Sequence, residues 1–186
     1  MPLARELLKR QAVFLDRDGV LNRAIVRDGR PYSPVGVHEV EIMAGVPEAC
    51  ERLRRHGLIL VVVTNQPEVA RGRLTRHSVE EINDLLRSRI PLDDIRVCYH
   101  DDADGCDCRK PKPGMLLSAA RDWDIDPGRS FVVGDRWKDI EAGRRAGCRT
   151  ILINHGYAEP RPPDTDFETR SLLLAVEWIL LRGARS

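Results

Sequence analysis

The stretch Phe14-Leu15-Asp16-Arg17-Asp18-Gly19-Val20-Leu21-Asn22 joins the end of an apolar run to two closely spaced carboxylates. Ala12–Leu15 favours a strand, and Gly19 favours a turn soon after it. The Asp16 carboxylate would then be fixed at the strand end, as a nucleophile or a metal ligand. Asp18, one step out on the loop, could act as a general acid and base. Taken alone, the pair fits turn or capping aspartates equally well.

The rest of the chain alternates strand and helix patterns, which is typical of a parallel sheet with right-handed crossovers. Leu58–Val63 is a continuous apolar run, as expected for a strand buried on both faces. Further strands are expected at Ile95–Tyr99, Phe131–Val133 and Thr150–Ile153. Helices are expected over Val46–His56, Arg76–Arg89, Gly114–Trp123, Trp137–Ala146 and Ser171–Leu181, the last with outer limits at about 167–182. The predicted fold is a single α/β domain over 1–186, Rossmann-like, with helices on both faces of the sheet.

Polar side chains follow the ends of the first four predicted strands. Besides Asp16 and Asp18, they are Thr64, Asn65, Arg109, Lys110 and Asp135. Because ligands of parallel sheets bind at the carboxyl ends of the strands, we expect these residues in one site. Hydroxyl, amide and cationic groups can hold a phosphate, and carboxylates suit Mg²⁺. Neither pair identifies a phosphate site on its own, because Thr-Asn also fits a helix cap and Arg-Lys also fits a solvated basic pair.

Three of the five cysteines crowd into eleven residues together with a histidine. The set is Cys98, His100, Cys106 and Cys108. Three thiolates and one imidazole form a recognised tetrahedral Zn²⁺ site, and four protein ligands leave no open position, so a structural metal is expected. Residues 99–109 carry few apolar side chains, so burial cannot order this loop, and a metal would fix Arg109 and Lys110 directly after it. The alternative is a flexible loop with reduced thiols.

The overall composition narrows the class of protein. With 30 Lys+Arg against 29 Asp+Glu, the net charge of +1 gives no bulk reason to bind nucleic acid or an anionic membrane. No apolar run reaches the roughly 20 residues that span a bilayer. The first eleven residues do not form a secretory signal pattern. We therefore expect a cytoplasmic protein that acts on a small molecule, and a monomer.

Four segments in this order resemble the haloacid-dehalogenase-like (HAD) phosphatases over roughly residues 12–155. They are residues 14–22, Val-Val-Thr-Asn-Gln at 62–66, Cys-Asp-Cys-Arg-Lys-Pro-Lys-Pro-Gly-Met at 106–115, and Val-Gly-Asp-Arg at 133–136. The chain looks most like the branch that contains heptose bisphosphate and histidinol-phosphate phosphatases. That branch has a minimal cap or none, which fits this length, so substrate contacts are expected from residues 23–45, the stretch after Asn65 and the cysteine-rich loop.

The resemblance implies a role for each matching residue. Asp16 would be the nucleophile that forms an aspartyl phosphate, Asp18 the general acid and base, and Lys110 the charge that stabilises the transferring phosphate. Mg²⁺ would lie between the Asp16 carboxylate, the Asp18 backbone carbonyl and Asp135. Thr64 and Asn65 would hold the phosphate and Arg109 the substrate, and the cysteine-rich loop would be the zinc loop of this branch.

The substrate is less narrowly defined. Ala70-Arg71-Gly72 after the Thr-Asn-Gln motif looks more like the heptose enzymes, so a heptose 1,7-bisphosphate losing its 7-phosphate is favoured. Arg71 and Arg73 could meet a second phosphate, and solvated surface arginines are the alternative. Tyr99 and Pro67-Glu68 depart from the family pattern. Histidinol phosphate or another sugar phosphate, a phosphotransferase and a catalytically silent zinc-stabilised binding module are the alternatives.

Overall fold

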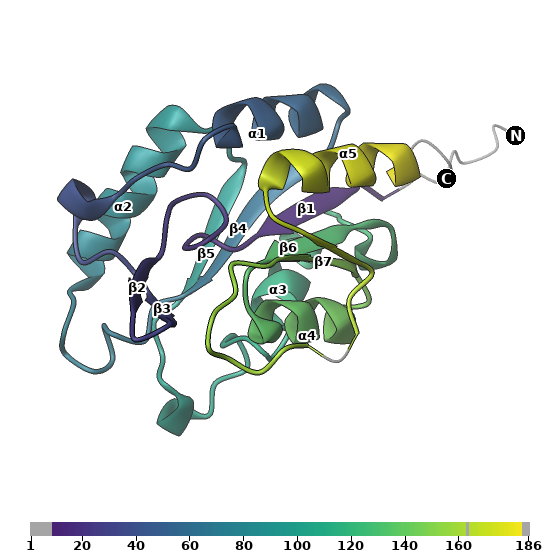
Figure 1. Cartoon of the computed structure of the whole chain (residues 1–186). Coiled ribbons are helices and arrows are strands. Elements are labelled where there is room, and N and C mark those ends of the chain that lie inside the picture. Colours follow the sequence, from purple (N-terminus) through teal and green to yellow (C-terminus); the bar gives the residue numbers. More distant parts are fainter. Residues whose placement is uncertain (1–8, 163, 184–186) are drawn as a thin grey trace, which may run out of the picture.

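The computed structural model describes residues 9–162 and 164–183 (Figure 1). A parallel six-stranded sheet in the order β5-β4-β1-β6-β7-β8 forms its centre. The strands are β1 (Ala12–Leu15), β4 (Ile59–Asn65), β5 (Asp94–Cys98), β6 (Phe131–Gly134), β7 (Arg149–Ile153) and β8 (Phe167–Thr169). The predicted α/β class and its parallel sheet are therefore confirmed.

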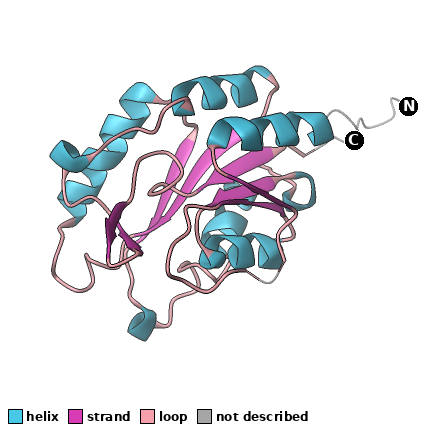
Figure 2. Cartoon of the chain, viewed as in Figure 1, coloured by secondary structure: helices cyan, strands magenta, loops and turns pink. Residues whose placement is uncertain are grey.

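Helices cover both faces of the sheet, as Figures 1 and 2 show. One face carries α1 (Val46–Arg55), α2 (Arg76–Arg89) and α5 (Leu172–Gly183), and the other carries α3 (Gly114–Asp122) and α4 (Trp137–Ala146). Short 3-10 turns lie at η1 (Val37–Glu39), η2 (Asp102–Asp104) and η3 (Pro127–Arg129). None of the helices in the described ranges is long and apolar enough to cross a membrane.

Strand β1 divides the core into two layers because successive side chains of a strand point to opposite faces. Val13 and Leu15 pack with α1, α2 and α5, whereas Ala12 and Phe14 pack with α3 and α4. All four side chains are fully buried. The continuous apolar run before Asp16 is thus explained, since neither face of this strand meets water.

The strand order reverses direction at β1. The chain passes from β1 to β4 and β5 on one side, and later to β6, β7 and β8 on the other. Crossovers that leave in opposite directions open a crevice at the carboxyl ends of the central strands. Asp16 lies at this point, and its backbone N–H donates to the Val133 carbonyl at 2.9 Å.

Residues 17–45, which connect β1 to α1, contain a small antiparallel hairpin. Its strands are β2 (Ile25–Arg27) and β3 (Arg30–Tyr32), joined by Asp28 and Gly29 at φ 50° and 73°. Asp-Gly is a favoured two-residue hairpin turn because both positions need positive φ. The strands are only three residues long and largely exposed, so apolar alternation does not reveal them. The hairpin lies in the stretch from which substrate contacts are expected, and its residues 30–33 line the pocket described below.

Two predicted boundaries are wrong. The C-terminal helix does not extend back to residue 167, because Phe167–Thr169 forms β8 on the edge of the sheet and α5 begins only at Leu172. Phe167 stacks on Trp178 of α5, which holds the edge strand against the helix. The second predicted strand also runs further than expected, since Thr64 and Asn65 continue the ladder with β5 rather than follow it.

Candidate active site

A pocket of about 400 Å³ opens at the carboxyl ends of the central strands. It brings together seven of the residues predicted from the sequence, which are Asp16, Asp18, Thr64, Asn65, Arg71, Arg109 and Lys110. Its walls also include residues 30–33 of the hairpin, which lie in the stretch expected to contact substrate, and Arg136 of the Val-Gly-Asp-Arg segment. Lys138 and Asp139 at the α4 start and residues 158–160 line it as well. Neither Asp135 nor the cysteine cluster lines this pocket.

Lys110 is the buried cation of the site. Its ammonium donates to Asp16 Oδ1 at 2.8 Å and to the Val63 carbonyl at 2.7 Å, and it lies 2.6 Å from Asp139 Oδ1. Burial opposes its charge, yet the charges of Asp139 and Asp16 outweigh burial and raise the pKa of Lys110. Lys110 is therefore charged and aimed at Asp16, and Asp139 anchors it.

Asp16 is 8% exposed. Burial and then the charge of Asp139 raise the pKa of Asp16 from 3.8 to about 6, while Lys110 counteracts them. Lys110 engages only the Oδ1 oxygen. The carboxylate thus keeps its second oxygen for a metal or an electrophile in a largely buried position.

Asp135 directly follows β6 and faces Asp16 across the sheet end. Among the described residues, neither of its buried carboxylate oxygens has a hydrogen-bond donor, and Tyr157 approaches without completing such a bond. Burial, followed by the charges of Asp16 and Asp139, raises the pKa of Asp135 well above its usual range. Buried oxygens without donors destabilise the fold unless something else binds them.

These carboxylates fit a divalent cation. One oxygen each from Asp16, Asp135 and Asp139 lies within 4.8 Å of the others. Both Asp139 oxygens are used, by Lys110 and by the Arg136 backbone N–H at 3.0 Å, which leaves Asp16 and Asp135 as donors. Carboxylate oxygens of this kind are the ligands that Mg²⁺ takes. Gly19, at φ 90°, makes room, since a Cβ there would lie 1.8 Å from Asp135 Oδ2.

Asp18 sits in a network of donors that sequence reasoning did not foresee. Arg17 binds both of its carboxylate oxygens at 3.1 Å, and Ser33 and Gln66 donate to Oδ2 at 2.8 and 2.9 Å. Burial alone would raise the pKa of Asp18, but Arg17 and the hydrogen bonds lower it. Arg17 is fully buried. Its position between two aspartates is the sequence feature that could have indicated an ion pair with Asp18.

The end of β4 is tied to the loop that carries Lys110. Asn65 Nδ2 donates to the Lys110 carbonyl at 3.0 Å, and the Lys110 N–H donates to Asn65 Oδ1 at 3.1 Å. The Thr64 hydroxyl accepts from Gln66 Nε2 at 2.9 Å, and Gln66 thereby links Thr64 to Asp18. Asn65 therefore fixes Lys110 as well as lining the pocket.

The two predicted substrate arginines are both held by aspartates of the cysteine-rich loop. Arg109 Nε lies 2.7 Å from Asp102 Oδ1. Arg71 is bidentate on Asp101 at 2.6 and 2.7 Å and also contacts Glu68 at 2.7 Å. Both arginines line the pocket, but most of the donors of Arg71 are already used. Its placement at a substrate phosphate remains a prediction.

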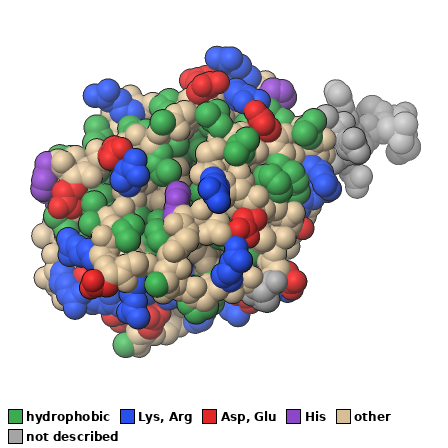
Figure 3. Space-filling model, viewed as in Figure 1, with side chains coloured by type: hydrophobic (Ala, Val, Ile, Leu, Met, Phe, Trp, Pro, Cys, Tyr) green, Lys and Arg blue, Asp and Glu red, His purple; other side chains and the backbone are tan. Residues whose placement is uncertain are grey.

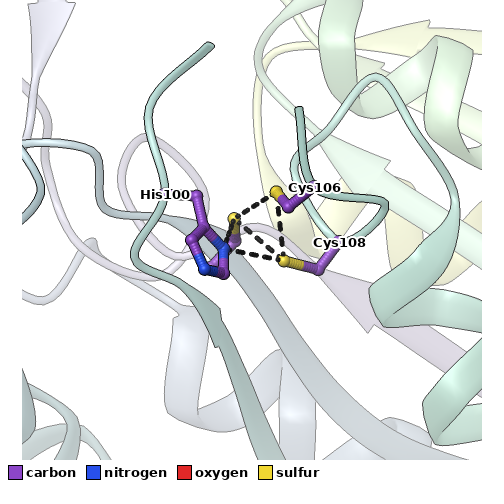
Figure 4. Close-up of side chains that lie close together, drawn as sticks. His100, Cys106 and Cys108 are labelled. Carbon is purple, nitrogen blue, oxygen red and sulfur yellow. Dashed lines mark hydrogen bonds between the residues drawn. The ribbon is translucent and has the colours of Figure 1, made fainter. Parts of the chain in front are cut away.

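The predicted metal ligands of the cysteine-rich loop come together at the end of β5 (Figure 4). Cys108 Sγ lies 3.2 Å from Cys98 Sγ, 3.4 Å from Cys106 Sγ and 3.3 Å from His100 Nδ1. Tetrahedral ligands with Zn–S of about 2.3 Å lie roughly 3.8 Å apart, so this cluster fits zinc with slight expansion. The ring faces the sulfurs through Nδ1.

Comparison with known proteins agrees with this geometry. A family model described as HAD-hydrolase-like matches residues 107–170. The parallel sheet ends on a buried Asp–Lys pair, and a second aspartate without a hydrogen-bond donor lies beside it. With the family match, this arrangement is that of a phosphoric monoester hydrolase of the HAD class.

Relatives extend the match to most of the chain. The D-glycero-beta-D-manno-heptose-1,7-bisphosphate 7-phosphatase of Pasteurella multocida is 38% identical over 95% of this chain and 100% of its own length. The Escherichia coli K12 protein of the same name is 36% identical over 91% and 87%. A crystal structure of D,D-heptose 1,7-bisphosphate phosphatase from B. bronchiseptica, complexed with magnesium and phosphate, superposes with a TM-score of 0.80 at 31% identity, covering 92% and 99%. The chain belongs to the HAD-like phosphatases, in the branch of these heptose bisphosphate phosphatases.

Proposed function

We propose that this chain removes the 7-phosphate of D-glycero-D-manno-heptose 1,7-bisphosphate through an aspartyl phosphate on Asp16. The observation that carries the proposal is the position of Asp16, which lines the pocket, binds the Lys110 ammonium through Oδ1 and lies close to the unpartnered oxygens of Asp135. Relatives that carry this activity in their names match nearly the whole chain, which supports the substrate.

The first chemical step would be attack by an Asp16 oxygen on phosphorus, with the sugar oxygen leaving. Asp16 and Asp135, with the Asp18 backbone carbonyl, would hold Mg²⁺, which offsets the repulsion between a carboxylate and a phosphate. Lys110 would stabilise the charge that builds on the transferring group, and Thr64 and Asn65 would bind its oxygens.

Asp18 would give a proton to the leaving sugar oxygen and later take one from the attacking water. The four side chains that donate to it hold it as a carboxylate, which suits the second role. For the first role it must gain a proton, and the negative charge of an arriving phosphate favours that, because a nearby anion raises the pKa of a carboxyl group.

We propose that Cys98, His100, Cys106 and Cys108 bind a structural Zn²⁺. The bound metal would order residues 99–109 and with them Asp101 and Asp102, which hold Arg71 and Arg109 at the pocket wall. The metal would thus act on substrate binding through these arginines and take no part in the chemical step, because four protein ligands leave it no open position.

Phosphate release from a set of sugar and amino-alcohol phosphates tests the substrate. The purified protein with Mg²⁺ should release phosphate fastest from heptose 1,7-bisphosphate, and ³¹P NMR should show loss of the signal of the 7-phosphate first. Faster turnover of histidinol phosphate would reassign the substrate within the same branch. Transfer of the phosphate to a sugar instead of water would indicate a phosphotransferase.

We further propose a cytoplasmic monomer made of one domain. All five cysteines are unpaired, as expected in a reducing compartment. On the face shown in Figure 3, positive and negative side chains are interspersed, which fits a small-molecule enzyme rather than a nucleic-acid or membrane-surface protein. Elution as a dimer from a sizing column would contradict the monomer.

A further inference from the structure

The cationic side chains of the pocket differ in whether a carboxylate accompanies them. Arg71, Arg109 and Arg136 each form an ion pair with an aspartate or a glutamate. Arg30 and Lys138 also line the pocket, and neither forms an ion pair with any residue in the ranges 9–162 and 164–183. An unpaired cation in a concave, partly enclosed site attracts anions more strongly than one on an open surface.

Lys138 is the better placed of these two side chains. It is partly buried, whereas Arg30 is exposed at the turn of the hairpin, where water screens its charge. The acidic side chains that act on Lys138 are Asp102 and Glu159. Both already serve another cation, since Asp102 pairs with Arg109 and Glu159 with Arg136. The charge of Lys138 therefore stays uncompensated within the pocket wall.

The position of Lys138 in its helix is not explained by an ion pair, although its ammonium lies over the Trp137 ring at 5.7 Å from the ring centroid. It is the second residue of α4, and the N-terminal turn of a helix favours negative rather than positive side chains. A lysine here opposes the helix dipole, makes no ion pair with the described residues and lines a ligand pocket. A bound anion would compensate the lysine charge.

We infer that Lys138 binds the phosphate that is not transferred, and that it sets the preference for a bisphosphate over a monophosphate substrate. The inference rests on the proposed function, which places the transferred phosphate at Asp16 and Lys110. Lys138, Asp16 and Lys110 line the same pocket of about 400 Å³, so one substrate can contact all three. Arg71 also lines the pocket, but three of its five donors are used by Asp101 and Glu68, which leaves it fewer donors for this phosphate.

Steady-state kinetics with heptose 1,7-bisphosphate and heptose 7-phosphate test this assignment. Lys138→Ala should raise KM for the bisphosphate about tenfold, as expected for the loss of one charge-assisted contact, and change kcat less than twofold. Its kcat/KM for the monophosphate should be unchanged, and Lys138→Arg should keep most of the preference. Arg27→Ala, which removes a cation from the same hairpin as Arg30 but outside the pocket wall, is the matched control.

The outcomes separate this inference from the proposed function. Wild-type protein that hydrolyses neither substrate contradicts both. Wild-type protein that prefers the bisphosphate, with Lys138→Ala affecting both substrates equally or neither, contradicts the role of Lys138 alone. Loss of the preference in Arg30→Ala but not in Lys138→Ala would place the second phosphate on the hairpin. Equal thermal unfolding temperatures of the variants and the wild type exclude misfolding as the cause.

Discussion

The ammonium of Lys110 lies 2.6 Å from the Asp139 carboxylate, and both side chains are almost fully buried. Asp139 thereby holds Lys110 in reach of Asp16 without being free for metal or substrate. Lys110→Met should lower kcat at least about 100-fold, because a preorganised charge on the transferring group is lost. Asp139→Asn should lower kcat about tenfold, since Lys110 keeps Asp16 as a partner but loses its anchor.

The double variant separates a positioning role of Asp139 from an independent one. If Asp139 acts through Lys110, then Lys110→Met with Asp139→Asn should be no slower than Lys110→Met alone, because the effects of residues in one network do not add. Effects that multiply in phosphate-release assays would show that Asp139 contributes to the reaction by a separate route.

Metal-free protein should lose stability as the pH rises. The pKa of Asp16 is raised to about 6 by burial and Asp139, and that of Asp135 is raised as well. A carboxyl group whose pKa is higher in the folded than in the unfolded state favours folding at low pH, and this contribution disappears as the pH passes the folded value. The unfolding temperature in the absence of Mg²⁺ should therefore fall from about pH 4, near the unfolded pKa of Asp16, to about pH 6, near its folded pKa, and the raised pKa of Asp135 extends the fall to higher pH.

Added Mg²⁺ should reverse this loss, with a larger increase in unfolding temperature at the upper pH, where the carboxyl groups are ionised. Asp135→Asn should raise the unfolding temperature of the metal-free protein at the upper pH and remove the effect of Mg²⁺. Equal Mg²⁺ effects in Asp135→Asn and the wild type would rule out Asp135 as a ligand.

Two glycines with left-handed backbone conformation test whether Asp135 needs the space that the absence of a Cβ at Gly19 leaves. Gly19 and Gly57 have φ of 90° and 78°, but a Cβ on Gly57 meets nothing within 4 Å, whereas one on Gly19 would overlap Asp135. Gly57→Ala should cost only backbone strain, about 1 kcal/mol, and keep activity. Gly19→Ala should bear the same strain, displace Asp135 and abolish Mg²⁺-dependent turnover. Similar activities of the two variants would contradict the proposed metal position.

Zinc content provides a check on the cysteine-rich loop. Wild-type protein should carry about one zinc per chain, and Cys108→Ser should lose it and unfold at a lower temperature, because binding free energy of a structural metal is folding free energy. Cys148→Ser, at a buried cysteine outside the cluster, should keep its zinc. Full zinc occupancy in Cys108→Ser, measured by elemental analysis, would exclude Cys108 as a ligand.

The sequence predicted those parts of the fold and site that depend on local patterns. Apolar runs marked β1 and β4, because a strand buried on both faces needs them, and polar residues at or just after the strand ends marked Asp16, Asp18, Thr64 and Asn65 of the pocket. The sheet rule then placed Asp16, Lys110 and Asp135 at one edge, although they are far apart in the chain.

Features that depend on long-range contacts could not be predicted in this way. The second role of Asn65, as a clamp on the Lys110 backbone, involves residues 45 positions apart. Residues 158–160 reach the pocket because the Ala158 N–H donates to the Gly29 carbonyl at 2.8 Å, and nothing local in a proline-rich connector indicates that contact. Strand β8 is too short to show the alternation of apolar and polar side chains that indicates a strand, and its pairing with β7 defines it.

The nucleophile assignment of Asp16 is the central claim, and phosphate release by Asp16→Asn is its most direct test. With heptose 1,7-bisphosphate and saturating Mg²⁺, the rate should fall at least about 1,000-fold, because asparagine cannot form the aspartyl phosphate. The variant should unfold no earlier than the metal-free wild type, since it removes a buried charge. Asp28→Asn, on the exposed hairpin turn, should keep full activity. Phosphate release by Asp16→Asn within tenfold of the wild-type rate would contradict the mechanism.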